Sequence, residues 1–397
     1  MAVTLDNEGH SKTCILVLGM HRSGTSALTR LISLLGADLP ATLLGGAAEN
    51  LASNAKGHWE SEVLVRLNDR ILESAGNSWH SPELIPDDWY KSASFEDFRT
   101  QALDCLKSEY KKSRLFVLKD PRVSKLVPFW TTVLNDFGAK TVVANIVRSP
   151  AEIGKSLGAR NGFDPTISEL LWLRYVLEAE RHSRQFPRLH VTYDGLLADS
   201  QQVIDTVVSN AQVSWPALSA ARRKQISNFI SESERHHHEA QKATSAGAVA
   251  AWSEEVYAIH EKWAEQGEEP HDHDLLNRIH GDLDALVQQF IGPILVAFEK
   301  TIAAHKLQKL REQQAASIDD YRQRFEDQQF AIANLMNSKA IDLEFVGADL
   351  SQFELDANRP EVTGFDPIVA KRDDHRPPRG KRRTVASLCN LEPADAS

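Results

Sequence analysis

A glycine-rich loop directly follows the first strongly apolar run of the chain. The run spans Cys14 to Leu18, and the loop from Gly19 to Ser26 reads GMHRSGTS before an amphipathic segment begins. Loop amides and a helix N-terminus can together bind an anion, because their N–H groups have no partner within the helix. A loop that holds the β- and γ-phosphates of ATP has lysine after its second glycine, whereas this chain has Thr25 there and Arg22 as the nearest cation. The loop therefore predicts a phosphate site that does not use ATP in the usual manner of a kinase.

A second set of residues suited to an anion follows another apolar run, 141–147. Arg148 comes directly after this run, and the residues from Ser149 to Glu152 fit the start of a helix with a capping box. Ser156 then lies about two turns into that helix. Ligands of open parallel sheets bind at the carboxyl ends of the strands, so we expect Arg148 and Ser156 to hold a second phosphate. The alternative interpretation is a surface charge at Arg148 and a solvated helix residue at Ser156.

Strands and helices must alternate to position these two elements. Short apolar runs alternate with longer segments of helical period through about residue 212, and the runs are apolar enough to be buried on both faces of a sheet. This order predicts an α/β protein with a P-loop-type three-layer fold and a parallel central sheet. The strands are expected at 14–18, 115–118, 141–147 and 190–193, and two of the helices at 27–35 and 63–72.

The chain divides by composition into three predicted regions. Residues 13–212 form the α/β nucleotide-binding domain, and 213–356 form a mostly helical C-terminal extension. Broken heptad spacing from 290 to 336 suits a helical hairpin or a coiled-coil contact, which would give either a homo-oligomer or packing on the α/β body. Residues 357–397 are rich in Pro, Arg and Asp, which predicts a disordered basic tail.

Length and composition fit a soluble chain. Its 397 residues are 42% hydrophobic and 25% charged, and the formal net charge of -10 argues against a protein whose whole surface binds nucleic acid. Three cysteines, Cys14, Cys105 and Cys389, are too far apart for a disulfide framework. No stretch approaches about 18 uninterrupted apolar residues, so we expect a cytoplasmic protein without a membrane span.

Two histidine-rich stretches raise the question of a metal site. They are His236 to His238 and the segment from His271 to Asp274. Neither has the helical spacing of a zinc-binding HExxH motif, so the sequence predicts solvated surface there and no metal.

Taken together, these motifs resemble the PAPS-dependent sulfotransferases, particularly bacterial members. PAPS is 3′-phosphoadenosine 5′-phosphosulfate. The resemblance covers about residues 13–212 and rests on the loop from Gly19 to Ser26, on Arg148 with Ser156, and on the segments Lys119 to Arg122 and Thr192 to Leu197. Many cytosolic members carry lysine where this chain has Arg22.

The resemblance implies a donor and a set of donor-binding residues. The first loop would bind the 5′-phosphosulfate, and Arg148 with Ser156 would bind the 3′-phosphate. The loop residues concerned are Arg22, Ser23, Gly24, Thr25 and Ser26. The reaction would move the sulfuryl group from PAPS to an acceptor hydroxyl, with a carbohydrate as one candidate, and release PAP without a metal.

Such a transfer needs alignment of donor and acceptor and stabilisation of the charge that develops on the leaving phosphate. Arg22 and the loop amides suit the second task. Lys119 either adds positive potential near the sulfuryl group or belongs, with the residues up to Arg122, to a structural ion pair and helix start.

The acceptor hydroxyl also needs a general base within hydrogen-bonding distance. Family members often place Glu or His before the second helix, where this chain has His58, Glu60 and, slightly earlier, Glu49. We expect Glu60 to be the base, followed by His58 and then Glu49. The alternative for Glu60 is a first-turn carboxylate that the helix dipole favours.

Two other functions fit parts of the same pattern. The first is an ATP-dependent small-molecule kinase with a degenerate phosphate loop, against which the missing lysine counts. The second is a non-catalytic nucleotide-binding scaffold whose helical C-terminal half binds a partner.

Overall fold

A computed structural model describes residues 12–44, 58–210, 213, 215–217, 222–226 and 247–345. By its contacts the chain forms two compact units, Met1–Ile318 and Asp319–Ser397. The region limits predicted at 212/213 and 356/357 stay predictions. Glu49, the stretch His236 to His238 and the segment 357–397 lie outside the described residues.

The centre of the first unit is the predicted parallel sheet. Its strands run in the order β2-β1-β3-β4, and every neighbouring pair is parallel. All four carboxyl ends therefore lie at one edge, which is the edge where open α/β sheets bind ligands. The strands are β1 (Lys12–Leu18), β2 (Leu115–Lys119), β3 (Ala139–Val147) and β4 (Arg188–Thr192).

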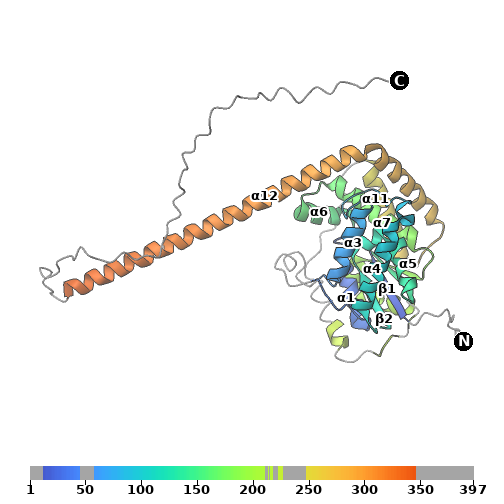
Figure 1. The fold of residues 1–397 in the computed structure, drawn as a ribbon, viewed down its shortest axis with the longest axis horizontal. Helices are drawn as coiled ribbons and strands as arrows, with labels where there is room; N and C mark the ends of the chain where they lie inside the picture. Colours follow the sequence, from blue (N-terminus) through green and yellow to red (C-terminus); the bar gives the residue numbers. More distant parts are fainter. Residues whose placement is uncertain are drawn as a thin grey trace, which may run out of the picture. The chain divides into compact units, whose positions relative to one another are not determined.

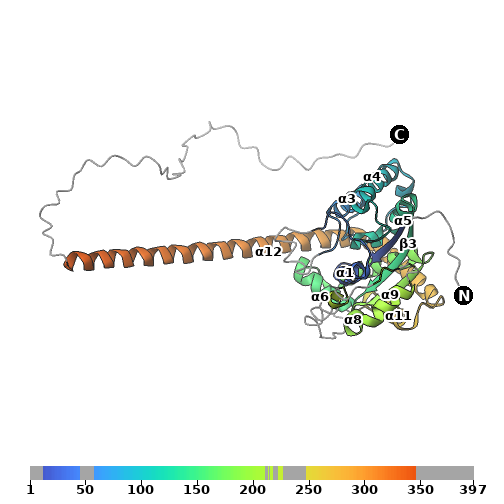
Figure 2. The same ribbon diagram turned by 90° about the horizontal axis from the view of Figure 1, so that it is seen from below.

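Helices cover both faces of the sheet, which confirms the three-layer α/β fold. Because side chains alternate along β1, Leu16 packs with α3, α4 and α5 on one face, while Ile15 and Val17 pack with α1, α8 and α9 on the other. Figure 2 shows α3, α4 and α5 on one side of β3 and α8 and α9 on the other. The helices of these layers are α1 (Thr25–Leu35), α3 (Glu62–Ser74), α4 (Ala93–Tyr110), α5 (Val127–Asp136), α8 (Tyr193–Ala198) and α9 (Ser200–Asn210).

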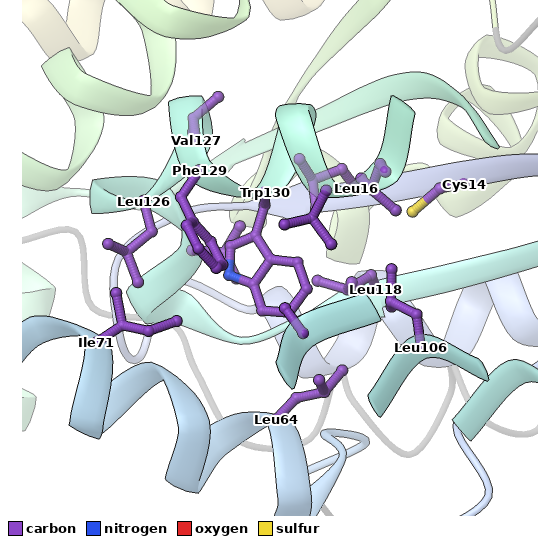
Figure 3. Packing of buried hydrophobic residues seen from close by; sticks show 14 of the residues in the cluster. Cys14, Leu16, Leu64, Ile71, Leu106, Leu118, Leu126, Val127, Phe129 and Trp130 are labelled. Carbon is purple, nitrogen blue, oxygen red and sulfur yellow. The ribbon is translucent and has the colours of Figure 1, made fainter. Parts of the chain in front are cut away.

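Large apolar side chains fill the first of these faces. Trp130 and Phe129 of α5 lie among Leu16 and Leu118 of the sheet and Ile71 of α3 (Figure 3). The Trp130 indole N–H donates to Asn68 Oδ1 at 2.8 Å, so this buried ring also has its polar atom satisfied. The packing fixes α3 and the chain entering it at Glu60.

A third apolar cluster joins the helical C-terminal region to the α/β body. It combines α6 (Pro150–Asn161) and α7 (Pro165–Ser183) with α11 (Ala248–Gln266) and the first turns of α12 (Asp272–Phe345). From α12 the buried members are Leu276, Ile279, Leu283 and Val287. The predicted helical character of this region is therefore confirmed for the described residues.

α12 is a single helix from Asp272 to Phe345, with Pro293 inside it (Figure 1). The hairpin predicted as one option for 290–336 is therefore wrong, while a coiled-coil contact stays a prediction. Within the described part of the chain, the helices include none that is long and apolar enough to cross a membrane.

Candidate anion-binding and transfer site

The loop from Gly19 to Ser26 joins β1 to α1 at the carboxyl edge of the sheet. Gly24, the N-cap of α1, has φ 91° and offers no side chain to cap the helix, so the first-turn amides stay available to an anion. A Cβ at Gly24 would lie 2.2 Å from Cδ2 of Tyr193, which follows β4. Arg22 also adopts a left-handed conformation, with φ 72°. The loop thus needs glycine at position 24, and it turns sharply at Arg22.

Buried hydrogen bonds hold this loop in place. The Ser23 hydroxyl donates to the Met20 carbonyl at 2.6 Å, and the Gly19 amide donates to Ser124 Oγ at 2.9 Å. A Cβ at Gly19 would lie 2.5 Å from the Ile146 carbonyl oxygen, so the loop passes close to β3. Since these contacts involve no ligand, the loop is preformed.

Lys119 brings a cation to the loop from the neighbouring strand. It ends β2, where it pairs in register with Val17 of β1. Its ammonium donates to Ser26 Oγ at 2.9 Å and to the His58 carbonyl oxygen at 3.0 Å. The loop has no lysine after its second glycine, but a lysine from β2 contacts it at Ser26.

The remainder of the Lys119 to Arg122 segment is structural. The Arg122 amide and guanidinium donate to Asp120 Oδ1 at 3.1 and 3.0 Å, and Asn68 donates to Asp120 Oδ2 at 2.8 Å. These bonds begin the short helix η2 (Pro121–Lys125). The structure shows the predicted helix start at Asp120 and Arg122 and an ion pair of Lys119 with Glu60, while a role of Lys119 at the sulfuryl group stays a prediction.

Glu60 lies against Lys119 just before α3. Its carboxylate oxygen Oε1 forms an ion pair with the Lys119 ammonium, and the Glu60 residue is only 6% exposed. Burial raises the pKa of Glu60, and the nearby Lys119 charge opposes that rise. A buried carboxylate with a raised pKa beside a phosphate loop is suited to accept a proton.

The other two base candidates are placed differently. His58 meets the loop through its main chain, because its carbonyl oxygen accepts from Ser26 Oγ at 3.0 Å and from Lys119. Its contact with this loop would therefore survive a change of side chain. Glu49 lies outside the described residues.

Arg148 follows β3 as predicted and is 9% exposed. Its Nε donates to Glu152 Oε2 at 2.6 Å, and its guanidinium carbon lies 4.5 Å from the centre of the Tyr193 ring. The predicted capping box is wrong: Ser149 is the N-cap of α6, but its side chain makes no capping bond. Glu152 binds the Arg148 guanidinium instead, because a full positive charge is the stronger partner.

Ser156 meets the first loop. Its hydroxyl accepts from Arg22 Nε at 2.9 Å, while Arg148 Nη1 lies 3.4 Å from the Arg22 carbonyl oxygen. Burial and the guanidinium groups of Arg160 and Arg148 lower the pKa of Arg22. The two predicted anion elements therefore adjoin each other, and positive charge concentrates between them.

Three contributors to this site were not assigned a role from sequence: Tyr193, His21 and Arg160. Tyr193 could have been found because it is the last residue of a predicted strand, and Arg160 because it lies one helical turn after Ser156. His21 packs edge-on against Trp79, with ring centres 5.0 Å apart, and its buried Nε2 has no hydrogen bond partner in the described chain. Burial and nearby cations lower the pKa of His21, which keeps its imidazole neutral.

Three residues whose side chains could bind a metal ion lie close together around the start of α12. Glu269, His271 and Asp272 have ligand atoms within 4.8 Å of one another. The Lys262 ammonium lies 2.8 Å from a Glu269 oxygen and 2.6 Å from an Asp272 oxygen. A cation of the protein itself thus already pairs with these two carboxylates.

Comparison with known proteins gives matches among solved structures alone. No protein-family model matches the chain, and no curated protein matches it. The sulfotransferase domain from the Synechococcus PCC 7002 olefin synthase is 16% identical, covers 64% of this chain and 98% of its own, and has a TM-score of 0.37. The sulfotransferase domain from the curacin biosynthetic pathway is also 16% identical, covers 69% of this chain and 98% of its own, and has a TM-score of 0.31.

Proposed function

We propose that this protein is a sulfotransferase that moves a sulfuryl group from PAPS to an acceptor hydroxyl. The observation that carries the proposal is the contact between its two anion elements. Arg22 of the phosphate loop donates to Ser156 of α6 at 2.9 Å, and Arg148 Nη1 lies 3.4 Å from the Arg22 carbonyl oxygen. PAPS carries anionic groups at its 5′ and 3′ positions, so adjoining anion elements on one sheet edge suit it.

The donor would be held by groups of fixed geometry. The amides of Gly24, Thr25 and Ser26 and the Arg22 guanidinium would bind the 5′-phosphosulfate, with the Ser23 hydroxyl holding the loop from within. Arg148 and Ser156 would bind the 3′-phosphate. As the bond from sulfur to the bridging oxygen breaks, negative charge develops on the 5′-phosphate, where Arg22, the loop amides and Lys119 stabilise it.

Glu60 would act as the general base. The acceptor oxygen forms a new bond to sulfur, PAP leaves, and the hydroxyl proton passes to the Glu60 carboxylate. Lys119 contacts Oε1, which leaves Oε2 to receive that proton. Burial supports this role because it raises the pKa of Glu60 above that of a solvated carboxylate, which makes Glu60 the stronger base.

The acceptor is proposed only as a hydroxyl compound, with a carbohydrate as the candidate class. A kinase or a non-catalytic scaffold would use the same loop differently. Dependence on ATP and Mg²⁺ would favour the kinase, and PAP binding without turnover on any hydroxyl acceptor would favour the scaffold.

The donor assignment is tested by calorimetry on the purified chain with PAP, ADP, ADP plus Mg²⁺ and adenosine 5′-phosphate. We expect PAP to bind most tightly and without any metal. Arg148→Ala should weaken PAP by about 1.5 to 3 kcal/mol, because a charge-assisted contact to the 3′-phosphate is lost. Glu152→Gln is the matched control, since it removes the ion pair of Arg148 but keeps the guanidinium. Equal affinity for PAP and adenosine 5′-phosphate would contradict the assignment.

A further inference from the structure

Arg160 lies in the last turn of α6, on the face that meets the phosphate loop. It follows Ser156 by four residues, and side chains at this spacing lie next to each other on a helix. Ser156 contacts Arg22 of the loop, so the same face directs Arg160 toward the candidate site. Arg160 itself is exposed to solvent, which leaves it accessible to a ligand.

The electrostatic neighbours of Arg160 lie on the transfer side of the site. Its charge lowers the pKa of Arg22 and of His21. Arg160 is exposed but partly desolvated by the surrounding protein, and this desolvation lowers its pKa; Glu60 opposes this shift, and Arg122 adds to it. These mutual effects place the Arg160 guanidinium within electrostatic range of both the loop cation and the proposed base.

Arg160 differs from the other cations of this edge in its pairing. Lys119 is paired with Glu60, Arg148 with Glu152, and Arg122 with Asp120. Within the part of the chain that the structure describes, the Arg160 guanidinium makes no hydrogen bond or ion pair. A guanidinium that lies near other cations and that no carboxylate contacts within the described residues is suited to bind an anion from outside the protein.

The backbone of Arg160 is held by α12. His305 Nε2 and Lys309 Nζ both donate to the Arg160 carbonyl oxygen at 2.9 Å. Gly162 ends α6 with φ 73°, and a Cβ there would lie 2.8 Å from the His305 side chain. The helical C-terminal region therefore fixes the end of the helix that carries Arg160.

We propose that Arg160 binds an oxyanion beside the contact between Arg22 and Ser156 and that α12 positions it for this. The inference deepens the proposed function and rests on it. The oxyanion would be either the sulfuryl group of the donor or an acidic group of the acceptor, because both present oxygens that a planar guanidinium can bind in pairs.

Inorganic sulfate is a suitable probe for this oxyanion site. We would titrate sulfate by calorimetry into the full chain saturated with PAP, so that the phosphate loop is already occupied, at constant ionic strength. Arg160→Gln should bind sulfate at least about tenfold more weakly and PAP within about twofold. Arg66→Gln, on the exposed surface of α3 with a side chain 75% exposed, is the control and should change neither. Sulfate affinity in Arg160→Gln equal to that of the wild type would overturn the proposal.

Repeating the sulfate titration with PAPS in place of PAP distinguishes the two sources of the oxyanion. Sulfate that no longer binds the PAPS complex identifies the subsite of the donor sulfuryl group. Sulfate that still binds identifies a subsite for an acidic acceptor. The double variant His305→Ala/Lys309→Ala should weaken sulfate with little effect on PAP, because only the position of Arg160 changes.

The test also separates this inference from the proposed function. If the chain fails to bind PAP, the sulfotransferase assignment fails, and sulfate is then titrated into the chain alone. Weaker sulfate binding by Arg160→Gln in that experiment would still support an oxyanion site, whereas unchanged binding would overturn it as well. Far-UV circular dichroism and melting curves must match between variants.

Discussion

Charges are arranged differently at the phosphate loop and at the interface of α7, β4, α11 and α12. At the interface, Arg174 is paired with Glu178 and Asp284, and its side chain is 1% exposed. Arg188 is 3% exposed and is paired with Glu180 and Glu268. Each buried guanidinium there has two carboxylates of the protein itself.

At the phosphate loop, cations are the more numerous. Arg22 lies near Arg148 and Arg160, and each of these guanidinium groups lowers its pKa. Among the described residues, the carboxylates nearest the loop and α6, Glu60 and Glu152, each pair with one basic side chain. We call the interface balanced because each buried guanidinium there is paired with carboxylates of the protein itself. Such pairing indicates a role in the fold, whereas a surplus of cations at an accessible edge indicates a role for a ligand.

The largest effect on stability should come from breaking the balanced interface. Arg174→Met should lower the free energy of unfolding by about 3 to 5 kcal/mol, because Glu178 and Asp284 lose a buried partner. The Pro82 carbonyl oxygen also loses a donor at 2.6 Å. Arg278→Met, at an exposed position of α12, should change it by less than about 0.5 kcal/mol. Urea unfolding measures both, and equal losses in the two variants would refute the comparison.

The largest effect on turnover should come from Glu60. Glu60→Gln keeps the size of the side chain but cannot take up the acceptor proton, so turnover should fall about a hundredfold or more, with PAP affinity within about twofold. Turnover is measured with labelled PAPS on a panel of hydroxyl acceptors.

His58→Gln is the matched control for Glu60→Gln, because the His58 carbonyl contacts do not depend on its side chain. Near-normal turnover in Glu60→Gln together with loss in His58→Gln would make His58 the base. Loss of PAP binding in both variants would make this segment structural.

A moderate effect of pH is expected at the balanced interface. Burial lowers the pKa of His190 and, more strongly, of His260, which favours the neutral form of both rings in the folded protein. In the unfolded chain histidine has a pKa of about 6.5, so below that pH the unfolded state binds more protons and the fold loses stability. Each histidine should contribute up to about 1.4 kcal/mol per pH unit below about 6.5. Denaturant unfolding at pH 7 and pH 5.5 measures this slope.

Two variants sharpen the pH prediction. His260→Leu should flatten the slope, because neither nitrogen of this ring has a hydrogen bond partner in the described chain. Burial disfavours the charged form of His280, but hydrogen bonds to Asp284 and Glu178 raise its pKa, so its contribution is present at low pH and is lost as pH rises through that pKa. His280→Gln should therefore make the loss of stability on acidification steeper. A slope that neither variant changes would assign the pH dependence elsewhere.

The smallest effect is expected from the basic tail. Deletion of residues 357–397 should leave PAP affinity and the melting temperature nearly unchanged, because a segment rich in Pro and Arg with few apolar residues adds little to a core. A fall in melting temperature of more than about 5 °C, measured by differential scanning calorimetry, would show that the tail stabilises the fold.

Local sequence was sufficient for the sheet and the phosphate loop. Continuous apolar runs indicate buried strands, and Gly24, the second glycine of the loop, fits a left-handed turn. The four strands and the loop could therefore be predicted within a few residues. The capping box at Ser149 was wrong because the carboxylate of Glu152 instead binds Arg148, which the end of β3 holds beside α6. The hairpin was wrong because α12 continues through Pro293.

The amino-acid sequence by itself determined which elements form and which residue types stand at the carboxyl edge of the sheet, because hydrophobic periodicity and loop conformation are local properties. Only the tertiary structure decided how those residues are paired. It joins Glu60 to Lys119 across 59 positions and Arg22 to Ser156 across 134, and it leaves the Arg160 guanidinium without a hydrogen bond or ion pair in the described chain. Such pairings depend on strand order and helix packing, which bring distant side chains together and set the burial that shifts their pKa values.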